Sequence, residues 1–358
     1  MIFALFLFNA TLFALALINF VTIRHPNKVS EVKESIQILL PVRNEEENIE
    51  RILAELITQE HIIDFKVLVI DDNSEDRTFE IAKRFESDRI QVINAPLPAP
   101  GWIGKVSALQ AGYEFLAANL ADIVISIDAD VHFEPDAITR AASTLNSAEL
   151  DFISPYPRQI AETWAERLIQ PLLQWSWMST VLLRGAEKFP MKSTVICNGQ
   201  FLVMRGSSLQ SIGGFTSVAH KVLDDIELGR SFVAAGFRGS VIDGSEVSST
   251  RMYSSFAEIK SGYGKSLHTA FGSIYGAIFA SLFMAVTGIL PLLYSLTGNL
   301  IAIAALLAIT GTRFISAAAS STRLRDSILH PLSSALFIYL LYFSWRNRGK
   351  TQWKGRTL

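Results

Sequence analysis

Between residues 35 and 130, short runs of β-branched and other apolar residues alternate with segments of helical periodicity. The apolar runs are residues 35–42, 65–72, 89–96 and 123–130, and the helical segments are residues 43–59, 77–85 and 104–119. Apolar runs of this length are typical of strands buried in a parallel sheet. The alternation therefore predicts an α/β fold with a doubly wound, mostly parallel sheet. Because crossovers between parallel strands are right-handed, all four strands should end at one edge of that sheet.

Acidic residues stand where three of these strands should end. Asp128 and Asp130 close the fourth run, Asp71 and Asp72 close the second, and Glu45 follows the first. Ligands of open α/β sheets bind at this edge, and two clustered carboxylates form a hard oxygen site suited to Mg²⁺ or Mn²⁺. An ordinary turn after the strand is the alternative interpretation of Asp128 and Asp130, because Asp is common in turns.

Residues 1–23 carry no charged side chain and are long enough to cross a bilayer as a helix. They lack the basic start and the small-residue cleavage site of a signal peptide. Arg24, His25 and Lys28 follow the apolar run, and the positive-inside tendency places such residues in the cytoplasm. We expect an uncleaved anchor with its N-terminus outside and the following domain in the cytoplasm.

The chain becomes apolar again in residues 271–345, where two to three further spans are expected. Residues 271–320 contain one basic residue, Arg313, and can form a hairpin that turns near Gly298 and Asn299. A shorter candidate follows from Ile328 to Trp345. Three spans would put the basic tail of residues 346–358 outside, against the positive-inside tendency. The segments indicate an integral membrane protein, which we expect in a bacterial inner (plasma) membrane.

The segment from Trp164 to Phe189 is rich in Trp and Leu and has few charges away from its ends. Within residues 160–189 it favours a pair of interfacial helices lying on the bilayer, where a lipid acceptor could enter sideways. A buried core helix broken at Pro171 is the alternative interpretation.

Charge and cysteine content exclude some classes of protein. The 358 residues carry 32 basic and 34 acidic side chains, for a net charge of −2, so no nucleic-acid partner is expected. Cys197 is the one cysteine of the chain. It can form neither an internal disulfide nor a cysteine metal cluster.

Five motifs occur in an order that resembles the family 2 glycosyltransferases with the GT-A fold. They are LLPVRNEEENI, VLVIDDNSEDRT, GWIGKVSALQAG, ISIDAD and LDDIELGR. The segments GWIGK, CNGQFLVMR, SIGGF and TRMY are similar to a membrane-anchored subgroup that includes hopanoid-associated and carotenoid-type enzymes. The resemblance covers residues 35–268 and is specific because several motifs keep their order.

This resemblance implies a nucleotide-sugar donor, with UDP expected from the habit of the family and GDP as the alternative. The implied nucleotide-sugar contacts are Pro41, Arg43, Glu45, Asp71, Asp72, Lys105 and Asp128. Lys105 would contact the diphosphate, where a cation offsets the charge of the leaving group. Asp128 and Asp130 would form the DxD motif and hold Mg²⁺ or Mn²⁺ as the cofactor.

On the acceptor side the resemblance implies that Asp225 is the catalytic base of a single, inverting displacement. Asp224 stands where the family has Glu, and Gln200 lies near a substrate-contacting position. Arg251 and Lys265 are possible phosphate contacts. The chain lacks the Gln-x-x-Arg-Trp motif of processive synthases, so one sugar should be transferred per lipid or apolar acceptor, to a hydroxyl or carboxylate.

Two other functions fit parts of the pattern. A membrane-tethered nucleotidyltransferase could share an α/β fold and metal carboxylates, although Asp225 after GGF argues against it. A catalytically silent scaffold or transport partner is the other alternative. The expected spans carry almost no charge, whereas transport paths are marked by polar residues.

Overall fold

The computed structural model describes residues 1–348, 352–353 and 356–357. Residues 349–351, 354–355 and 358 of the basic tail expected at residues 346–358 lie outside the described residues. The chain forms two compact units. The sheet unit comprises Arg24–Arg158 and Gly185–Thr250, and the helical unit comprises Met1–Ile23, Gln159–Arg184 and Arg251–Leu358.

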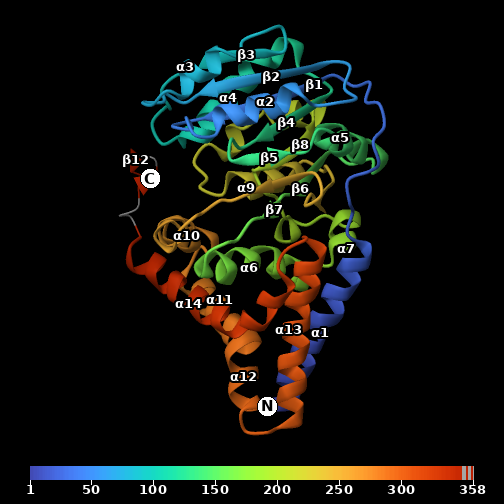
Figure 1. The fold of residues 1–358 in the computed structure, drawn as a ribbon, viewed down its shortest axis with the longest axis vertical. Coiled ribbons are helices and arrows are strands. Elements are labelled where there is room, and N and C mark those ends of the chain that lie inside the picture. Colours follow the sequence, from blue (N-terminus) through green and yellow to red (C-terminus); the bar gives the residue numbers. More distant parts are fainter. Residues whose placement is uncertain (349–351, 354–355, 358) are drawn as a thin grey trace. The chain divides into compact units, whose positions relative to one another are not determined.

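The sheet unit is built on a seven-stranded sheet with the order β3-β2-β1-β4-β8-β6-β9 (Figure 1). Its strands are β1 Ile36–Val42, β2 Phe65–Asp71, β3 Ile90–Asn94, β4 Ile123–Ile127, β6 Phe152–Tyr156, β8 Phe201–Arg205 and β9 Gly239–Asp243. All neighbours pair in parallel except β8, which is antiparallel to both β4 and β6. A second, three-stranded sheet contains β5 Val131–Phe133, β10 Ser248–Thr250 and β7 Arg158–Gln159. The predicted α/β fold with a mostly parallel sheet is confirmed.

Helices cover both faces of the large sheet because its strands are apolar on both faces. They are α2 Ile49–Ile57, α3 Thr78–Lys83, α4 Gly104–Leu116, α5 Ala137–Ser147, α8 Gly206–Ser211 and α9 Asp224–Ala234, and α7 Leu183–Lys188 lies where the chain passes between the units. Along β1, Ile38 and Leu40 pack into one core cluster and Leu39 into the other. Each such buried side chain stabilises the fold by about 1.5–3 kcal/mol.

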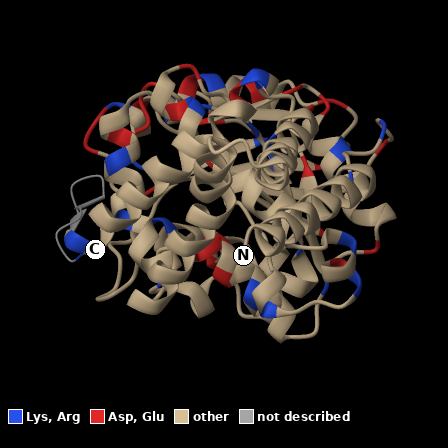
Figure 2. Ribbon diagram, turned by 90° about the horizontal axis from the view of Figure 1, so that it is seen from below, with Lys and Arg blue, Asp and Glu red and all other residues tan. Residues whose placement is uncertain are grey.

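Four helices of the helical unit are long and apolar enough to cross a membrane. They are Ile2–Thr22, Ile274–Ser295, Leu300–Ala319 and Leu324–Arg346. Most of their ribbon is tan in Figure 2, the colour of residues without charge. The expected turn is confirmed, since Gly298 has a φ of 76° and the Asn299 side chain accepts hydrogen bonds from the N–H groups of Ile301 and Ala302.

The helical unit consists of α1 Ile2–Thr22, α6 Trp164–Thr180, α10 Phe256–Ala270, α11 Ile274–Met284, α12 Leu290–Ser295, α13 Leu300–Ala319 and α14 His330–Arg346. A π-helical turn, Ala285–Ile289, joins α11 to α12, and the 3₁₀ segment Leu324–Leu329 leads into α14. The suggested break at Pro171 is wrong, because α6 runs through this residue. A capping box between Thr163 and Glu166 starts α6, and Ile169 and Trp175 anchor it in the core of the unit.

Gly239 of β9 packs closely against the ring of Phe152 of β6. A Cβ at this position would lie 2.3 Å from two ring carbons of Phe152. Overpacking a core in this way costs about 1–3 kcal/mol. We therefore expect Gly239→Ala to lower the midpoint of thermal unfolding of the full chain in detergent, and Ser240→Ala to leave it nearly unchanged. Equal midpoints for the two variants would show that the ring has room to move.

Candidate active site

The carboxyl ends of β1, β2 and β4 bring together residues that lie far apart in the sequence. The three strands are parallel neighbours in the order β2-β1-β4. Pro41, Arg43 and Glu45 come from the end of β1, and Asp71 and Asp72 from the end of β2. Asp128 and Asp130 follow β4 directly, in the turn that leads to β5.

The fourth strand is shorter than the predicted run of residues 123–130. Residues 128–130 are not an extended continuation of β4, because the strand ends at Ile127. Arg51 of α2 holds the two carbonyl groups on either side of Asp130. Its Nη2 donates to the Ala129 oxygen at 3.0 Å, and its Nη1 donates to the Val131 oxygen at 2.8 Å. Arg51 therefore positions the turn that carries both aspartates, a role that its place in a helix did not reveal.

The two loops after β1 and β2 are joined to each other. Buried Arg43 donates from Nη1 to the main-chain carbonyl oxygen of Asp72 at 2.6 Å and forms an ion pair with Glu75 at 3.4 Å. Asn44 and Asn73 adopt positive φ angles of 52° and 56°, which asparagine tolerates better than most residues. The nucleoside roles expected for Pro41, Arg43, Glu45, Asp71 and Asp72 stay predictions, and the structure adds that Arg43 holds the loop shape.

One carboxylate oxygen of Asp71 accepts a hydrogen bond, and the other accepts none from the described residues. Its Oδ2 accepts a hydrogen bond from the Ser74 N–H at 2.9 Å. Its Oδ1 is buried and has no hydrogen-bond partner within the described part of the chain. A buried acceptor without a donor is costly, so this oxygen is suited to a donor group supplied by a ligand.

Lys105, at the start of α4, is the cation of the site. Its Nζ lies 2.6 Å from Asp128 Oδ1, and it also feels the charges of Asp224 and Asp225. Burial alone would lower the pKa of Lys105, but these three carboxylates outweigh it and hold the pKa above its usual value. The lysine therefore remains protonated and links the carboxylates after β4 to those of α9.

The pKa of Asp130 is raised by its burial and by the neighbouring carboxylates. Burial raises its pKa, the charges of Asp128 and Glu45 raise it further, and Lys105 opposes them, so that the pKa reaches about 7. No group of three or more His, Cys, Asp or Glu side chains arranged to hold a metal occurs in residues 1–348. Asp128 shares the charge of Lys105 with Asp224 and Asp225. Asp128 and Asp130 together therefore fit a cation such as Mg²⁺ that takes its other ligands from phosphate and water.

Asp225 is held in a fixed orientation at the first turn of α9. Its Oδ2 accepts a hydrogen bond from the Gly199 N–H at 2.9 Å, and its Oδ1 accepts one from the Ile226 N–H at 2.8 Å. Burial and the charge of Asp224 raise the pKa of Asp225 to about 6, against the opposing effect of these N–H groups and of Lys105. A carboxylate of this kind is suited to accept a proton near neutral pH.

Gly199 is a site residue that the motifs did not single out. A Cβ on Gly199 would lie 3.2 Å from Lys105 Nζ and 3.3 Å from Asp225 Cβ, so the glycine lets both side chains approach its N–H. Tyr156, at the end of β6, is another, because burial and the nearby charge of Asp225 raise the pKa of its hydroxyl. Gly199 lies in the segment CNGQFLVMR, but its role depends on its contact with Asp225, and Tyr156 carries no local signal.

Three residues of the expected acceptor side stay predictions. Gln200 is buried, and its Oε1 accepts a hydrogen bond from the Asn198 Nδ2 at 2.9 Å. Arg251 belongs to the helical unit, where it forms ion pairs with Glu162 at 2.7 Å and Glu166 at 3.2 Å. Lys265 lies on α10 of the same unit. A phosphate role for Arg251 would require competition with these two carboxylates.

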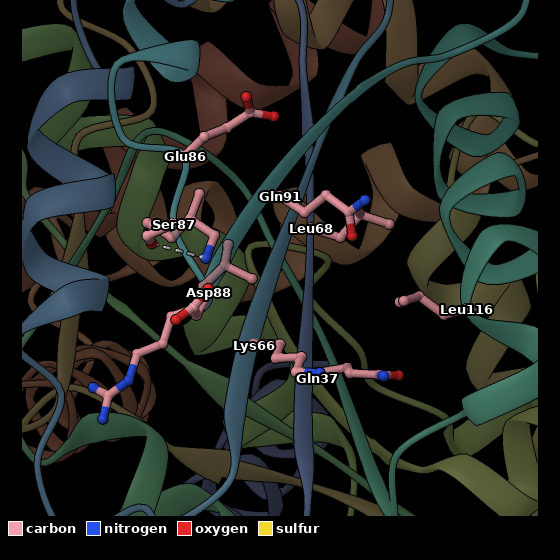
Figure 3. A pocket seen from close by; sticks show the side chains of 11 residues that line it. Gln37, Lys66, Leu68, Glu86, Ser87, Asp88, Gln91 and Leu116 are labelled. Atoms are coloured by element: carbon pink, nitrogen blue, oxygen red, sulfur yellow. Dashed lines mark hydrogen bonds between the residues drawn. The ribbon is translucent and has the colours of Figure 1, made fainter.

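A cavity of about 280 Å³ lies at the other edge of the sheet (Figure 3). Gln37, Lys66 and Gln91, near the starts of β1, β2 and β3, are among its lining residues. The amide of Gln37 is bonded to the Asn119 oxygen and the Ala121 N–H, both at 3.0 Å. The cavity is therefore separate from the carboxylate cluster, and the amide of Gln37 is already bonded to the protein.

Comparison with known proteins agrees with this architecture. Residues 37–213 match the model of the family described as Glycosyl transferase family 2. The protein is a glycosyltransferase, and the matched residues of its sheet unit are similar to family 2. The family and the sheet topology confirm the resemblance drawn from the motifs, including the GT-A fold.

Its curated relatives include 4,4'-diaponeurosporenoate glycosyltransferases of Staphylococcus aureus. The proteins of strains MRSA252 and bovine RF122 / ET3-1 are each 24% identical over 343 residues, covering 90% of this chain and 88% of the relative. A similar solved structure is the mannosyltransferase PcManGT from Pyrobaculum calidifontis in complex with GDP-Man and Mn²⁺. It has a TM-score of 0.53 and 15% identity, and the match covers 97% of this chain and 98% of that one.

The charge cluster predicts that Asp130 destabilises the protein when no cation is bound. Its pKa in the folded protein, about 7, exceeds the value of about 3.9 for an unperturbed aspartate. The folded state therefore binds the proton more tightly, and stability falls as pH rises between these two values. We expect Asp130→Asn to raise the midpoint of thermal unfolding at pH 8 and to match the wild type near pH 4.

Mn²⁺ provides the control for this measurement. Because a cation neutralises the cluster, adding Mn²⁺ at pH 8 should stabilise the wild type and leave Asp130→Asn nearly unaffected. A variant that is no more stable than the wild type at pH 8 would show that Asp130 is not under electrostatic strain.

Proposed function

We propose that this glycosyltransferase moves one sugar from a nucleotide-sugar to a hydroxyl group of a lipid or other apolar acceptor at a membrane, with inversion at the anomeric carbon. The observation that carries the proposal is the position of Lys105. Its ammonium forms an ion pair with Asp128 and also interacts with the charges of Asp224 and Asp225. A sugar donor bound at the lysine would thus lie between a metal site and a base.

On the donor side, Asp128 and Asp130 would hold Mg²⁺ or Mn²⁺. A divalent cation bound there would offset negative charge on the leaving diphosphate. Lys105 adds a fixed positive charge at the same place and requires no reorganisation during the reaction. The solved structure of PcManGT, which contains GDP-Man and Mn²⁺, supports a nucleotide-sugar and a divalent cation as a pair.

The nucleoside would be held at the ends of β1 and β2. The uncommitted Oδ1 of Asp71 can accept a hydrogen bond from a base N–H or a ribose hydroxyl. Arg43 keeps the loop that follows Asp71 in shape. UDP is our choice for the nucleotide, on the habit of the family, and GDP is the alternative.

On the acceptor side, Asp225 would take the proton of the attacking hydroxyl. The N–H groups of Gly199 and Ile226 fix both of its oxygens, so the carboxylate is oriented before the acceptor arrives. In a single displacement the acceptor attacks opposite the departing nucleotide, which inverts configuration. The chain lacks the Gln-x-x-Arg-Trp motif, in line with one sugar per acceptor.

A membrane location suits an apolar acceptor. Four helices can cross a bilayer, and Arg24 and Lys28 follow the first of them. On the positive-inside tendency, the sheet unit faces the cytoplasm, which in a bacterium means the inner face of the plasma membrane. Nucleotide-sugars would be delivered to the sheet unit from that side, and the acceptor from the bilayer.

The name of the curated relatives favours a second acceptor. They are named for 4,4'-diaponeurosporenoate, which by its suffix is a carboxylate. A carboxylate acceptor is already ionised at neutral pH and requires no base, whereas a hydroxyl acceptor does. The dependence of transfer on Asp225 therefore distinguishes the two acceptors.

We expect Asp225→Asn to lower turnover with a hydroxyl acceptor by about 10²–10⁴-fold, because a general base is lost. Donor affinity should change little, since the base acts only in the chemical step. The assay is transfer from a panel of UDP- and GDP-sugars to extracted membrane lipids, with products identified by mass spectrometry and donor binding measured separately.

Glu227→Gln is the matched control, because Glu227 lies on the same helix turn but pairs with Arg230 at 2.6 Å. Near-normal turnover of Asp225→Asn on a hydroxyl acceptor would remove Asp225 as the base. Loss of transfer that is restricted to hydroxyl acceptors would establish its role and leave carboxylate acceptors as a base-independent reaction.

The pKa of Asp225 also predicts a pH profile. The base works when ionised, so kcat/KM at saturating Mn²⁺ should fall as pH drops below about 6. Asp224 raises the pKa of its neighbour and Lys105 lowers it. In Asp224→Asn the acidic limb of the profile should therefore move to lower pH. An upward shift, or no shift, would contradict the electrostatic coupling of the two aspartates.

A further inference from the structure

A group of polar side chains is buried without partners among the apolar helices of the helical unit. Arg313 on α13 is 3% exposed, and His330 at the start of α14 is fully buried. Neither the Arg313 Nη1 nor either ring nitrogen of His330 has a hydrogen-bond partner among residues 1–348. The same holds for the hydroxyls of Ser327 and Ser333 and for the Gln174 Nε2. We call these five residues the arginine-histidine cluster.

Contacts between neighbouring helices hold the cluster together. Trp175 of α6 donates from its ring N–H to the Thr312 hydroxyl at 2.6 Å, and its ring centroid lies 4.5 Å from that of His330. Arg313 also interacts electrostatically with His330. These contacts place Arg313, His330 and Trp175 in one region between α6, α13 and α14, and Ser327 and Ser333 stand three residues before and after His330.

No ion pair of Arg313 occurs among the described residues of the unit. The carboxylate of Asp326 interacts electrostatically with Arg313. However, Asp326 already forms an ion pair with two hydrogen bonds to Arg167 of α6. With Arg167 and Asp326 cancelling, one positive charge remains. A charged side chain inside a membrane-spanning segment is costly and usually marks a functional site, and a buried donor without an acceptor adds to the cost.

The chemistry of the cluster selects an anion. A guanidinium donates two parallel hydrogen bonds to a carboxylate or a phosphate. An imidazole, two hydroxyls and an amide N–H₂ group supply further donors. One excess positive charge matches one negative charge on the ligand.

The surroundings of the cluster select an amphiphile over a free ion. Phe314, Ile328 and Leu332 adjoin Arg313, Ser327 and Ser333 in the sequence and are 50%, 72% and 59% exposed. If these helices cross a bilayer, such exposed apolar side chains would face lipid chains. An acyl or isoprenoid chain can lie along them while its head group reaches the donors.

We propose that the arginine-histidine cluster binds the monoanionic head group, a carboxylate or a phosphodiester, of a membrane amphiphile within the helical unit. The site is separate from the carboxylates of the sheet unit and does not require that the proposed glycosyl transfer be correct.

Lipid retention by the purified full chain tests the proposal. After extraction in mild detergent, native mass spectrometry should find one amphiphile per wild-type chain and none on Arg313→Met, which keeps the length of the side chain and removes its charge. The mass identifies a phosphodiester or a carboxylate. In titrations with phosphatidylglycerol and with oleate, Arg313→Met should raise the dissociation constant of the better ligand at least tenfold.

Arg325→Met is the matched control, because Arg325 is exposed in the segment next to the cluster, and it should bind like the wild type. His330→Phe keeps a ring against Trp175 and loses both nitrogens, so it should weaken binding several-fold and serves if Arg313→Met does not fold. Equal binding by the wild type and the cluster variants would overturn the proposal. Inorganic phosphate that displaces the lipid at equal concentration would overturn the assignment to an amphiphile.

Discussion

The negative charge collected at the carboxyl edge of the sheet is the constraint on which the candidate site depends. Lys105 is one cation among Asp128, Asp224 and Asp225, and its ion pair with Asp128 leaves Asp130 beside Glu45 with a raised pKa. The fold thus keeps a cluster that is electrostatically incomplete. Sites of this kind sacrifice stability for function, and a bound cation would relieve the excess negative charge.

The cluster persists because the structure around it is over-determined. Arg51 holds the carbonyls on both sides of Asp130, and Arg43 ties the loop after β2 to the end of β1. The backbone N–H groups of Gly199 and Ile226 hold Asp225. None of these contacts needs a ligand, so the carboxylates are oriented in advance and little reorganisation is left for the reaction.

Local sequence patterns predicted the parts of the molecule that depend on local physics. The first four strands, their helices and the turn at Gly298 follow from periodicity and turn chemistry, and the strand-end position of Asp128 and Asp130 follows from the parallel order. Gly199, Tyr156 and Arg51 were missed because their roles arise from contacts across the sheet. Pro171 misled because tertiary packing of Ile169 and Trp175 outweighs the hydrogen bond that a proline removes.

The two units show the same physical signature with opposite signs. At the candidate site of the sheet unit, several carboxylates surround the single ammonium of Lys105. A ligand that balances their charge must be positive. In the helical unit, Arg313 Nη1 and the ring nitrogens of His330 have no hydrogen-bond partner among residues 1–348, and a ligand that balances the charge of Arg313 must be negative. A polar group that is buried without a partner costs free energy in any folded chain. Its persistence in a low-dielectric setting is explained most simply by a ligand that the bare polypeptide does not contain, and the sign of the missing charge tells which ligand to seek.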